Sequence, residues 1–247
     1  MPESTPQTIR LNDIGLRYLS TLQHLSDLMV LTWAGARGVS EQSYEETFRS
    51  IAGLPSTQFR FKLETARTEA ARWQFKNSLG DLVNLSLVFL EDIRKVCGLV
   101  VFNVAKAQAS GDLAGLAAEI NADNGPLDIS TRLQHLKTRY GLALPLEAEL
   151  LSIAAVQHCF ARTGGVIPQD GGELTLRLKA IQPPAEGSTE PRLADYQRPW
   201  KAGEHIAVSR EEHAAVFTTI SVFVSSMLTA VQEFAKTSGL PENLPVQ

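Results

Sequence analysis

Residues 150–169 read LLSIAAVQHCFARTGGVIPQ, and this stretch decides the fold. Its apolar residues recur every three or four positions, which is the spacing of one buried face of an α-helix. Pro145 precedes the run, where proline suits the first turn of a helix, and Gly164-Gly165 follows it, where glycine commonly ends one. The stretch therefore predicts a core helix over residues 146–163 that ends in a glycine turn.

The same helical periodicity extends towards the N-terminus. It predicts a helix from Ile9 to about Trp33, ended by the glycine-containing residues 34–38. Ser40 is a suitable N-cap for a short helix that runs to Ile51. These segments predict that the N-terminal part of the chain is helical throughout.

The longest helical stretch covers residues 63–109. Because glycine weakens a helix interior, we expect this stretch to break or bend near Gly80 or Gly98. Two shorter helices are expected over residues 112–121 and 130–140, and the Asn-Gly-Pro sequence at 124–126 predicts a turn between them.

Little β-structure is expected. Residues 173–181 alternate apolar and polar side chains, as a strand does, and residues 205–208 are short and β-branched. Residues 182–203 contain four prolines and are expected to form a long loop. The sequence thus predicts an all-α fold with a minor β hairpin, in a single domain over residues 1–247 with a Pro-rich excursion at about 182–203.

The composition excludes several classes of protein. The chain has 247 residues, 23 Lys and Arg, 27 Asp and Glu, a net charge of −4 and 44% hydrophobic residues. A folded chain of this size hides roughly 70% of its unfolded surface, which is enough to fold without metals or disulfides. Collagen-like, disordered and small disulfide-rich proteins are therefore excluded.

The cysteines and the N-terminus indicate a cytoplasmic protein. Cys97 and Cys159 lie in apolar helical contexts and form no CxxC pair, so we expect buried free thiols. Residues 1–10 lack the basic start and apolar run of a secretory signal. No membrane partner is expected.

Residues 214–231 are uncharged and about long enough to cross a membrane. Their polar side chains nevertheless share one side of the predicted helix, and apolar ones share the other. We interpret this segment as an amphipathic helix whose small hydroxyl face is packed, against another chain for example. The members of that face are Thr218, Ser221, Ser225, Ser226 and Thr229.

No common motif for cofactor or metal binding is present. The sequence contains no GxxxxGK[ST], GxGxxG, GxSxG or HExxH. None of its five histidines follows a Glu by three positions, as helical di-iron sites require. We therefore expect no cofactor and no metal ion.

Residues 59–76 interleave basic and aromatic side chains, a pattern that can bind single-stranded nucleic acid. Trp73 and Phe75 are expected on the buried face of the helix instead, and Glu64 and Glu69 dilute the positive charge. RNA is accordingly a weakly supported partner.

The features around residues 150–169 resemble the HEPN superfamily of helical bundles. In that superfamily the last core helix carries an arginine, a polar residue, three or more further residues, and then a histidine before a glycine turn. The resemblance covers about residues 130–234, including the Tyr-Gly-Leu turn at 140–142 and the segment 203–208 that leads into a closing helix. It implies a dimeric helical bundle and, in active members, a metal-independent ribonuclease site assembled between two subunits.

This sequence departs from the motif at both catalytic positions. Gln157 stands at the arginine position and Arg162 at the histidine position. Glutamine is uncharged and arginine stays protonated, so neither can act as an ordinary acid–base catalyst. An imidazole and a cation remain at His158 and Arg162, four residues apart on one helix face.

These departures favour a degenerate, non-catalytic HEPN-like protein that acts through protein–protein interaction or homodimerisation. The resemblance implies a bacterial toxin–antitoxin or defence context. The alternative is a metal-independent ribonuclease with a rearranged site made of His158, Arg162 and Gln157. A third interpretation is that these three residues merely end a core helix in hydrogen bonds.

Overall fold

The structure is a computed structural model that describes residues 10–50, 61–122, 128–184 and 191–238. Within those ranges the chain is mainly helical and has one small antiparallel sheet, as the sequence predicted. In chain order the elements are α1 (Leu11–Gly38), α2 (Glu41–Ser50), α3 (Leu63–Ala107), α4 (Leu113–Asn121), α5 (Ile129–Tyr140), α6 (Glu147–Thr163), β1 (Leu174–Gln182), β2 (Arg192–Trp200) and α7 (Arg210–Thr237).

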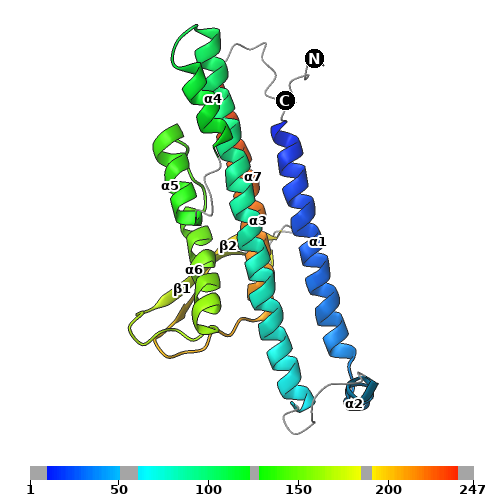
Figure 1. Cartoon of the computed structure of the whole chain (residues 1–247). Coiled ribbons are helices and arrows are strands. Elements are labelled where there is room, and N and C mark those ends of the chain that lie inside the picture. Colours follow the sequence, from blue (N-terminus) through cyan, green and yellow to red (C-terminus); the bar gives the residue numbers. More distant parts are fainter. Residues whose placement is uncertain (1–9, 51–60, 123–127, 185–190, 239–247) are drawn as a thin grey trace.

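The three longest helices, α1, α3 and α7, lie side by side and form the body of the molecule (Figure 1). α5 and α6 pack on α3 on the side away from α1, and α4 packs on α3 as well. The β1–β2 hairpin contacts both α6 and α7 through β1. This arrangement places the turn after α6 next to the hairpin.

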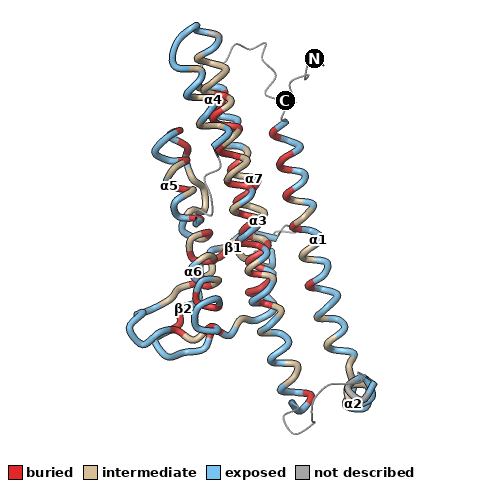
Figure 2. Tube along the Cα trace, viewed as in Figure 1, coloured by how far each residue is buried: buried red, intermediate tan, exposed pale blue. Residues whose placement is uncertain are grey.

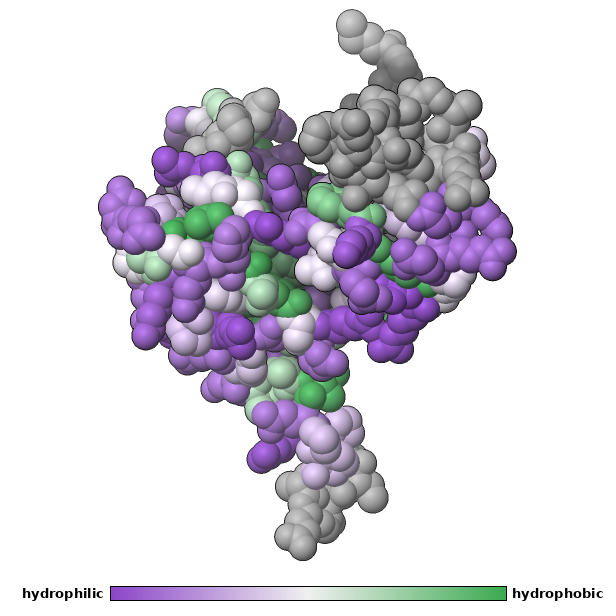
Figure 3. Space-filling view, turned by 90° about the horizontal axis from the view of Figure 1, so that it is seen from below, coloured by the Kyte–Doolittle hydropathy of each residue, from purple (hydrophilic) through white to green (hydrophobic). Residues whose placement is uncertain are grey.

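Buried hydrophobic residues from α1, α3, α5, α6, α7 and β1 form one continuous core. At its centre Phe89 of α3 and Phe223 of α7 meet edge to face, with ring centroids 6.1 Å apart. Such a pair contributes about 1 kcal/mol beyond its burial. Burial is concentrated along α3, α6 and α7, whereas the outward side of α1 is mostly exposed (Figure 2). Seen from below, the surface is mainly hydrophilic with smaller hydrophobic patches (Figure 3).

The expected break in the longest helical stretch is absent: α3 is one continuous helix of 45 residues. Gly98 instead permits a close approach of α4, because a Cβ at Gly98 would lie 2.8 Å from Cγ1 of Ile120. Gly80 faces open space, and the buried neighbours Leu79 and Leu82 hold the helix in the core on either side of it. Tertiary packing therefore outweighs the cost of about 1 kcal/mol for each interior glycine.

The first helix also continues further than expected. Residues 34–38, which were expected to follow the helix, form its last turn. Helical packing around half-buried Trp33 and Ala36 again outweighs the weak helix preference of glycine. Ser40 caps α2 as predicted, since its Oγ accepts a hydrogen bond of 3.1 Å from the N–H of Ser43. The predicted last residue of that helix, Ile51, and the predicted turn at 124–126 lie outside the described residues.

The prediction of a long loop over residues 182–203 is wrong in part, because Arg192–Trp200 forms β2. β2 pairs with β1 from Gln182 opposite Arg192 to Leu174 opposite Trp200. Pro199, which argued against a strand, is tolerated because each strand of a two-stranded sheet has an outer edge that needs no N–H donor. The hydroxyl of Tyr196 on β2 also donates a hydrogen bond to Glu212 of α7.

The second expected strand, at residues 205–208, is reduced to a single bridge between Val166 and His205. Its backbone is used to hold the turn after α6, since Ile206 N–H donates to the carbonyl of Gly165 at 2.8 Å. The segment therefore holds the turn after α6 by backbone hydrogen bonds and does not form the expected strand.

Among the described helices, α7 alone has the length and apolar composition to cross a membrane, and 50% of its most apolar window is buried in the protein. Its apolar side packs on α1, α3, α6 and β1. The start of α7 carries a capping box, in which Ser209 and Glu212 bond reciprocally across the first turn. A core helix of a globular protein has these same properties.

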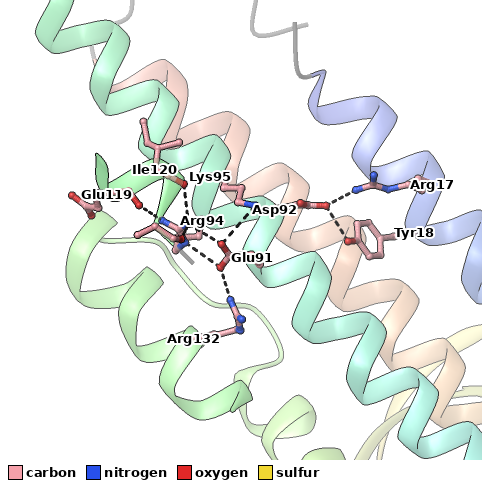
Figure 4. Close-up of polar contacts among 10 residues, drawn as sticks. Arg17, Tyr18, Glu91, Asp92, Arg94, Lys95, Glu119, Ile120 and Arg132 are labelled. Atoms are coloured by element: carbon pink, nitrogen blue, oxygen red, sulfur yellow. Dashed lines mark hydrogen bonds and ion pairs between the residues drawn. The ribbon is translucent and has the colours of Figure 1, made fainter. Parts of the chain in front are cut away.

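A polar network fixes α4 and α5 against α3 (Figure 4). Arg94 of α3 is buried and binds the Glu91 carboxylate, with Nη2 2.7 Å from Oε1. It also donates to the carbonyls of Glu119 and Ile120 at the end of α4, at 2.8 and 3.1 Å. Burial would raise the pKa of the Glu91 carboxyl, but Arg94 and Arg132 of α5 outweigh it and hold the pKa below its ordinary value. The network thus satisfies helix-end carbonyls and a buried charge together.

Candidate functional site at the end of α6

The last turn of α6 is formed by residues whose polar groups are satisfied locally. The Thr163 hydroxyl lies within hydrogen-bonding distance of the carbonyl oxygens of Cys159, at 2.8 Å, and Val166, at 2.5 Å. Gly164 has φ 65° and ends the helix in the left-handed conformation that glycine adopts without strain. The predicted glycine turn is therefore confirmed.

Two neighbouring segments hold the turn in place. Ile167 N–H donates to the carbonyl of Glu204 at 2.9 Å, and Gly203 N–H donates to the carbonyl of Ile167 at 2.9 Å. Arg72 of α3 donates to the carbonyl of Gly164. These hydrogen bonds fix the backbone at the end of α6 and thereby position the side chains of its last two turns.

His158 and Arg162 line one cavity of about 490 Å³. α6 forms one wall, and the segment that runs from Ile167 into β1 forms the other. The further residues that line the cavity are Ala155, Cys159, Thr163, Pro168, Asp170, Gly171, Glu173 and Leu174. The structure therefore places the imidazole and the guanidinium at the same cavity, as their spacing of four residues predicted.

The charges of this cavity are unfavourable for binding an RNA phosphate. Asp170 and Glu173 line it together with Arg162, so two carboxylates stand against one permanent cation. His158 and Arg162 are both solvent-exposed. Oxyanion stabilisation depends on donors in a water-excluded site, which these exposed side chains do not provide.

Gln157 lies apart from the other two candidates. It lines a separate depression of about 230 Å³ against α3, together with Lys76, Asp81 and Asn84. The structure therefore brings together two of the three candidate residues within one chain and leaves the third on a different side of α6.

The cysteines are free and buried, as expected. Burial raises the pKa of the Cys97 thiol to about 12, so this thiol stays protonated and unreactive at neutral pH. Across the described part of the chain, no cluster of three or more His, Cys, Asp or Glu side chains has the arrangement of a metal site.

Within the described residues 61–76, the aromatic rings of the basic-aromatic stretch are divided between the core and the surface. Phe75 is buried in the core, as expected, but Trp73 is 68% exposed, contrary to the expectation that both rings face inward. Trp73 lies two positions before Phe75, which a helix places on nearly opposite sides. Phe59 and Arg60 lie outside the described residues.

Sequence reasoning missed a second group of charged residues. Arg37 of α1, Arg67 of α3 and Arg210 of α7 line one small cavity between these three helices. Only Arg67 belonged to a segment that the sequence singled out. No local signal could have found the group, because its members are far apart in the chain and meet through helix packing.

The chain was compared with family models, with curated proteins and with solved structures, and no match was found.

Proposed function

We propose that this chain is a non-catalytic, HEPN-like helical protein that acts by pairing with a second copy of itself. The proposal includes the cytoplasmic, bacterial toxin–antitoxin or defence context that the resemblance implies. Support for the HEPN-like part comes from the order of elements: a core helix with polar residues near its end, a glycine turn, a hairpin and a closing helix. The observation that carries the pairing is an uncharged groove between α1 and α7.

The groove has a volume of about 400 Å³ and lies beside the end of β1. Its apolar walls come from Leu19 and Leu22 of α1 and from Phe217 and Val222 of α7. The polar side chains of Thr218, Ser221, Gln23 and Ser26 also line it, and none of the described residues in its lining is charged. An uncharged surface meets its own copy across a two-fold axis without bringing like charges together.

One large apolar side chain that lines the groove is exposed in the single chain. Ile181, at the end of β1, is 64% exposed. A second copy that covers the groove would remove this side chain from water, which is favourable for association.

The hydroxyl face of α7 belongs to the same surface. Ser225 and Thr229 are exposed, and Thr218, Ser221 and Ser226 are half-buried. Ser225 and Thr229 donate to carbonyls one turn earlier in α7, so their hydrogen bonding needs no partner chain. Small side chains of this kind allow another helix to approach closely, which supports the prediction that a second chain covers this face.

The chemistry at the end of α6 supports the non-catalytic part of the proposal. Arg162 cannot exchange its proton, and Asp170 and Glu173 share its cavity. A histidine lines the same cavity, but a ribonuclease would also need unopposed positive charge for the phosphate.

The test of pairing is the substitution Ser221→Glu. Ser221 is half-buried, so a single chain tolerates glutamate there, whereas a paired interface would bury two like charges. We expect the wild type to sediment as a dimer and Ser221→Glu as a monomer with a similar far-ultraviolet circular dichroism spectrum. The matched control is Ser130→Glu, at an exposed position on α5 on the other side of the bundle.

The proposal fails if the wild type is monomeric at all concentrations, or if Ser221→Glu and Ser130→Glu both remain dimeric. If Ser221→Glu does not fold, Ile181→Lys addresses the same groove at a position that is 64% exposed in the single chain.

The second candidate function is a metal-independent ribonuclease, favoured by the shared cavity of His158 and Arg162. Incubating the protein with structured and single-stranded RNA in the presence of a chelator tests it. Cleavage by the wild type that His158→Ala abolishes would establish the enzyme and overturn the non-catalytic proposal. No cleavage by the wild type, or equal trace cleavage by the wild type and His158→Ala, would support the non-catalytic proposal.

A further inference from the structure

The cavity that contains Arg37, Arg67 and Arg210 lies where the C-terminal part of α1, the N-terminal part of α3 and the start of α7 meet. Its volume is about 240 Å³, and its remaining walls include Trp33, Thr32 and Gln74. This is smaller than the cavities that bind drug-sized ligands, which measure about 300–1,000 Å³. It suits a small anion or a single phosphoryl group.

Packing against other groups holds two of the three guanidinium groups in place. Arg210 lies over the ring of Trp33, with its Cζ 5.8 Å from the ring centroid. Arg67 donates from Nη2 to the carbonyl of Val39 at 2.6 Å. These contacts reduce the entropy that the side chains would lose on binding a ligand.

Arg67 also has an unsatisfied donor. Its Nε is buried and has no hydrogen-bond partner among the described residues. Buried donors without partners are rare in folded proteins and commonly indicate a missing water or ion. The unpaired Nε belongs to a side chain that lines the cavity.

The cavity is lined by three positively charged side chains, although the chain as a whole has a net charge of −4. No carboxylate is among the described residues that line the cavity, although acidic residues outnumber basic ones by 27 to 23 in the sequence. Glu64 pairs with Arg67 at 2.6 Å and is 81% exposed, and the pKa of the Glu211 carboxyl is lowered by hydrogen bonds at the start of α7 and also by the charges of Arg210 and Arg37. Both lie outside the lining.

The N–H groups at the start of α7 are not part of this site. The Ser209 side chain accepts from Glu212 N–H, and the Glu212 carboxylate accepts from Ser209 N–H. The donors available to a ligand are therefore the arginine side chains, which match the geometry of phosphate oxygens.

We propose that the cavity formed by Arg37, Arg67 and Arg210 binds the phosphate group of a small phosphate monoester. The volume selects a compact ligand, and the three guanidinium groups supply donors for a dianion with three terminal oxygens. The site lies between α1, α3 and α7 and does not depend on self-association or on the His158 cavity.

The test is isothermal titration calorimetry of the full chain with glycerol phosphate, with inorganic phosphate and acetate in parallel. We expect both phosphates to bind and acetate to bind far more weakly. Arg37→Gln and Arg210→Gln should each weaken phosphate binding about tenfold or more, since each removes charge-assisted hydrogen bonds. Glu64→Gln should tighten it, because this change releases Arg67 from its ion pair.

The control is Arg177→Gln, which removes an exposed arginine of β1 outside the cavity and should leave the affinity unchanged. Equal weakening by Arg177→Gln and Arg37→Gln would indicate diffuse attraction and overturn the proposal. The absence of phosphate binding by the wild type would overturn it as well. Tighter binding of a 5′-hydroxyl RNA than of glycerol phosphate would overturn the proposal of a small ligand and indicate that the site binds a nucleic acid.

Discussion

At the scale of single residues, the two glycines after α6 have different roles although they are adjacent. Gly164 and Gly165 both have positive φ, of 65° and 87°. A Cβ at Gly164 would meet nothing within 4 Å, whereas a Cβ at Gly165 would lie 2.5 Å from the ring of Phe160. Gly164 is therefore needed for backbone conformation alone, and Gly165 for conformation and space.

We predict that Gly164→Ala destabilises the fold by about 1 kcal/mol, the usual cost of alanine at positive φ. Gly165→Ala should cost about 2–4 kcal/mol, because displacement of a buried ring adds to that strain. Urea unfolding of the two variants and the wild type measures both values. Equal losses would mean that Phe160 moves aside freely.

At the scale of elements, Arg94 decides how α4 and α5 are attached to α3. It is one buried side chain that pairs with Glu91 and satisfies carbonyls at the end of α4. α4 has no fully buried residue among those described, so the polar contacts of Arg94 add to the half-buried apolar contact of Ile120 with Gly98. Lys95 is one position further along α3 and lies 3.9 Å from the same carboxylate, but it is 43% exposed.

We predict that Arg94→Ala costs about 3–5 kcal/mol, because it leaves the Glu91 carboxylate partly uncompensated. Lys95→Ala is the matched control and should cost less than about 1 kcal/mol, since exposed ion pairs contribute little. Amide hydrogen exchange would locate the effect, with faster exchange in α4 in the first variant only. Unchanged exchange in α4 would show that its attachment does not depend on Arg94.

At the scale of the whole molecule, α1, α3 and α7 converge on the buried side chain of His213. Its ring meets Phe75 of α3 and Trp33 of α1 edge to face, at 4.9 and 5.4 Å between centroids. Its Nε2 lies 2.5 Å from Oγ of Ser78, whose hydroxyl is placed to donate to the Phe75 carbonyl. Burial lowers the pKa of His213 to about 4, so the histidine is neutral in the folded protein at physiological pH.

This pKa predicts a specific dependence of stability on pH. The unfolded chain takes up a proton near the ordinary histidine value of about 6.5, while the folded chain does so near 4. The contribution is therefore complete above about pH 6.5 and is lost as the pH falls towards 4. The total loss is about 3 kcal/mol, from a difference of about 2.5 pKa units at 1.36 kcal/mol each.

Unfolding free energies of the wild type and His213→Phe between pH 7 and pH 4 test this. The variant keeps an aromatic ring and should show a shallower decline, because the carboxylates with lowered pKa, such as Glu91 and Glu119, contribute equally to both proteins. Parallel curves for the two proteins would contradict the prediction.

The sequence by itself determined that the chain is mainly helical and that a glycine turn follows α6. Apolar spacing in 150–163 and the glycines that follow are local properties, and a helix forms from residues within a few turns of one another. The same local reasoning placed His158 and Arg162 on one face of α6.

Only the tertiary structure decided which remote residues meet. Pairing of β2 with β1, the continuity of α3 through Gly98, and the meeting of Arg37, Arg67 and Arg210 all depend on contacts between separate elements. Periodicity shows that a helix has a buried face but not which helix covers it. Side-chain packing between α1, α3 and α7 settles that choice, because it must fill the core and satisfy every buried polar group at once.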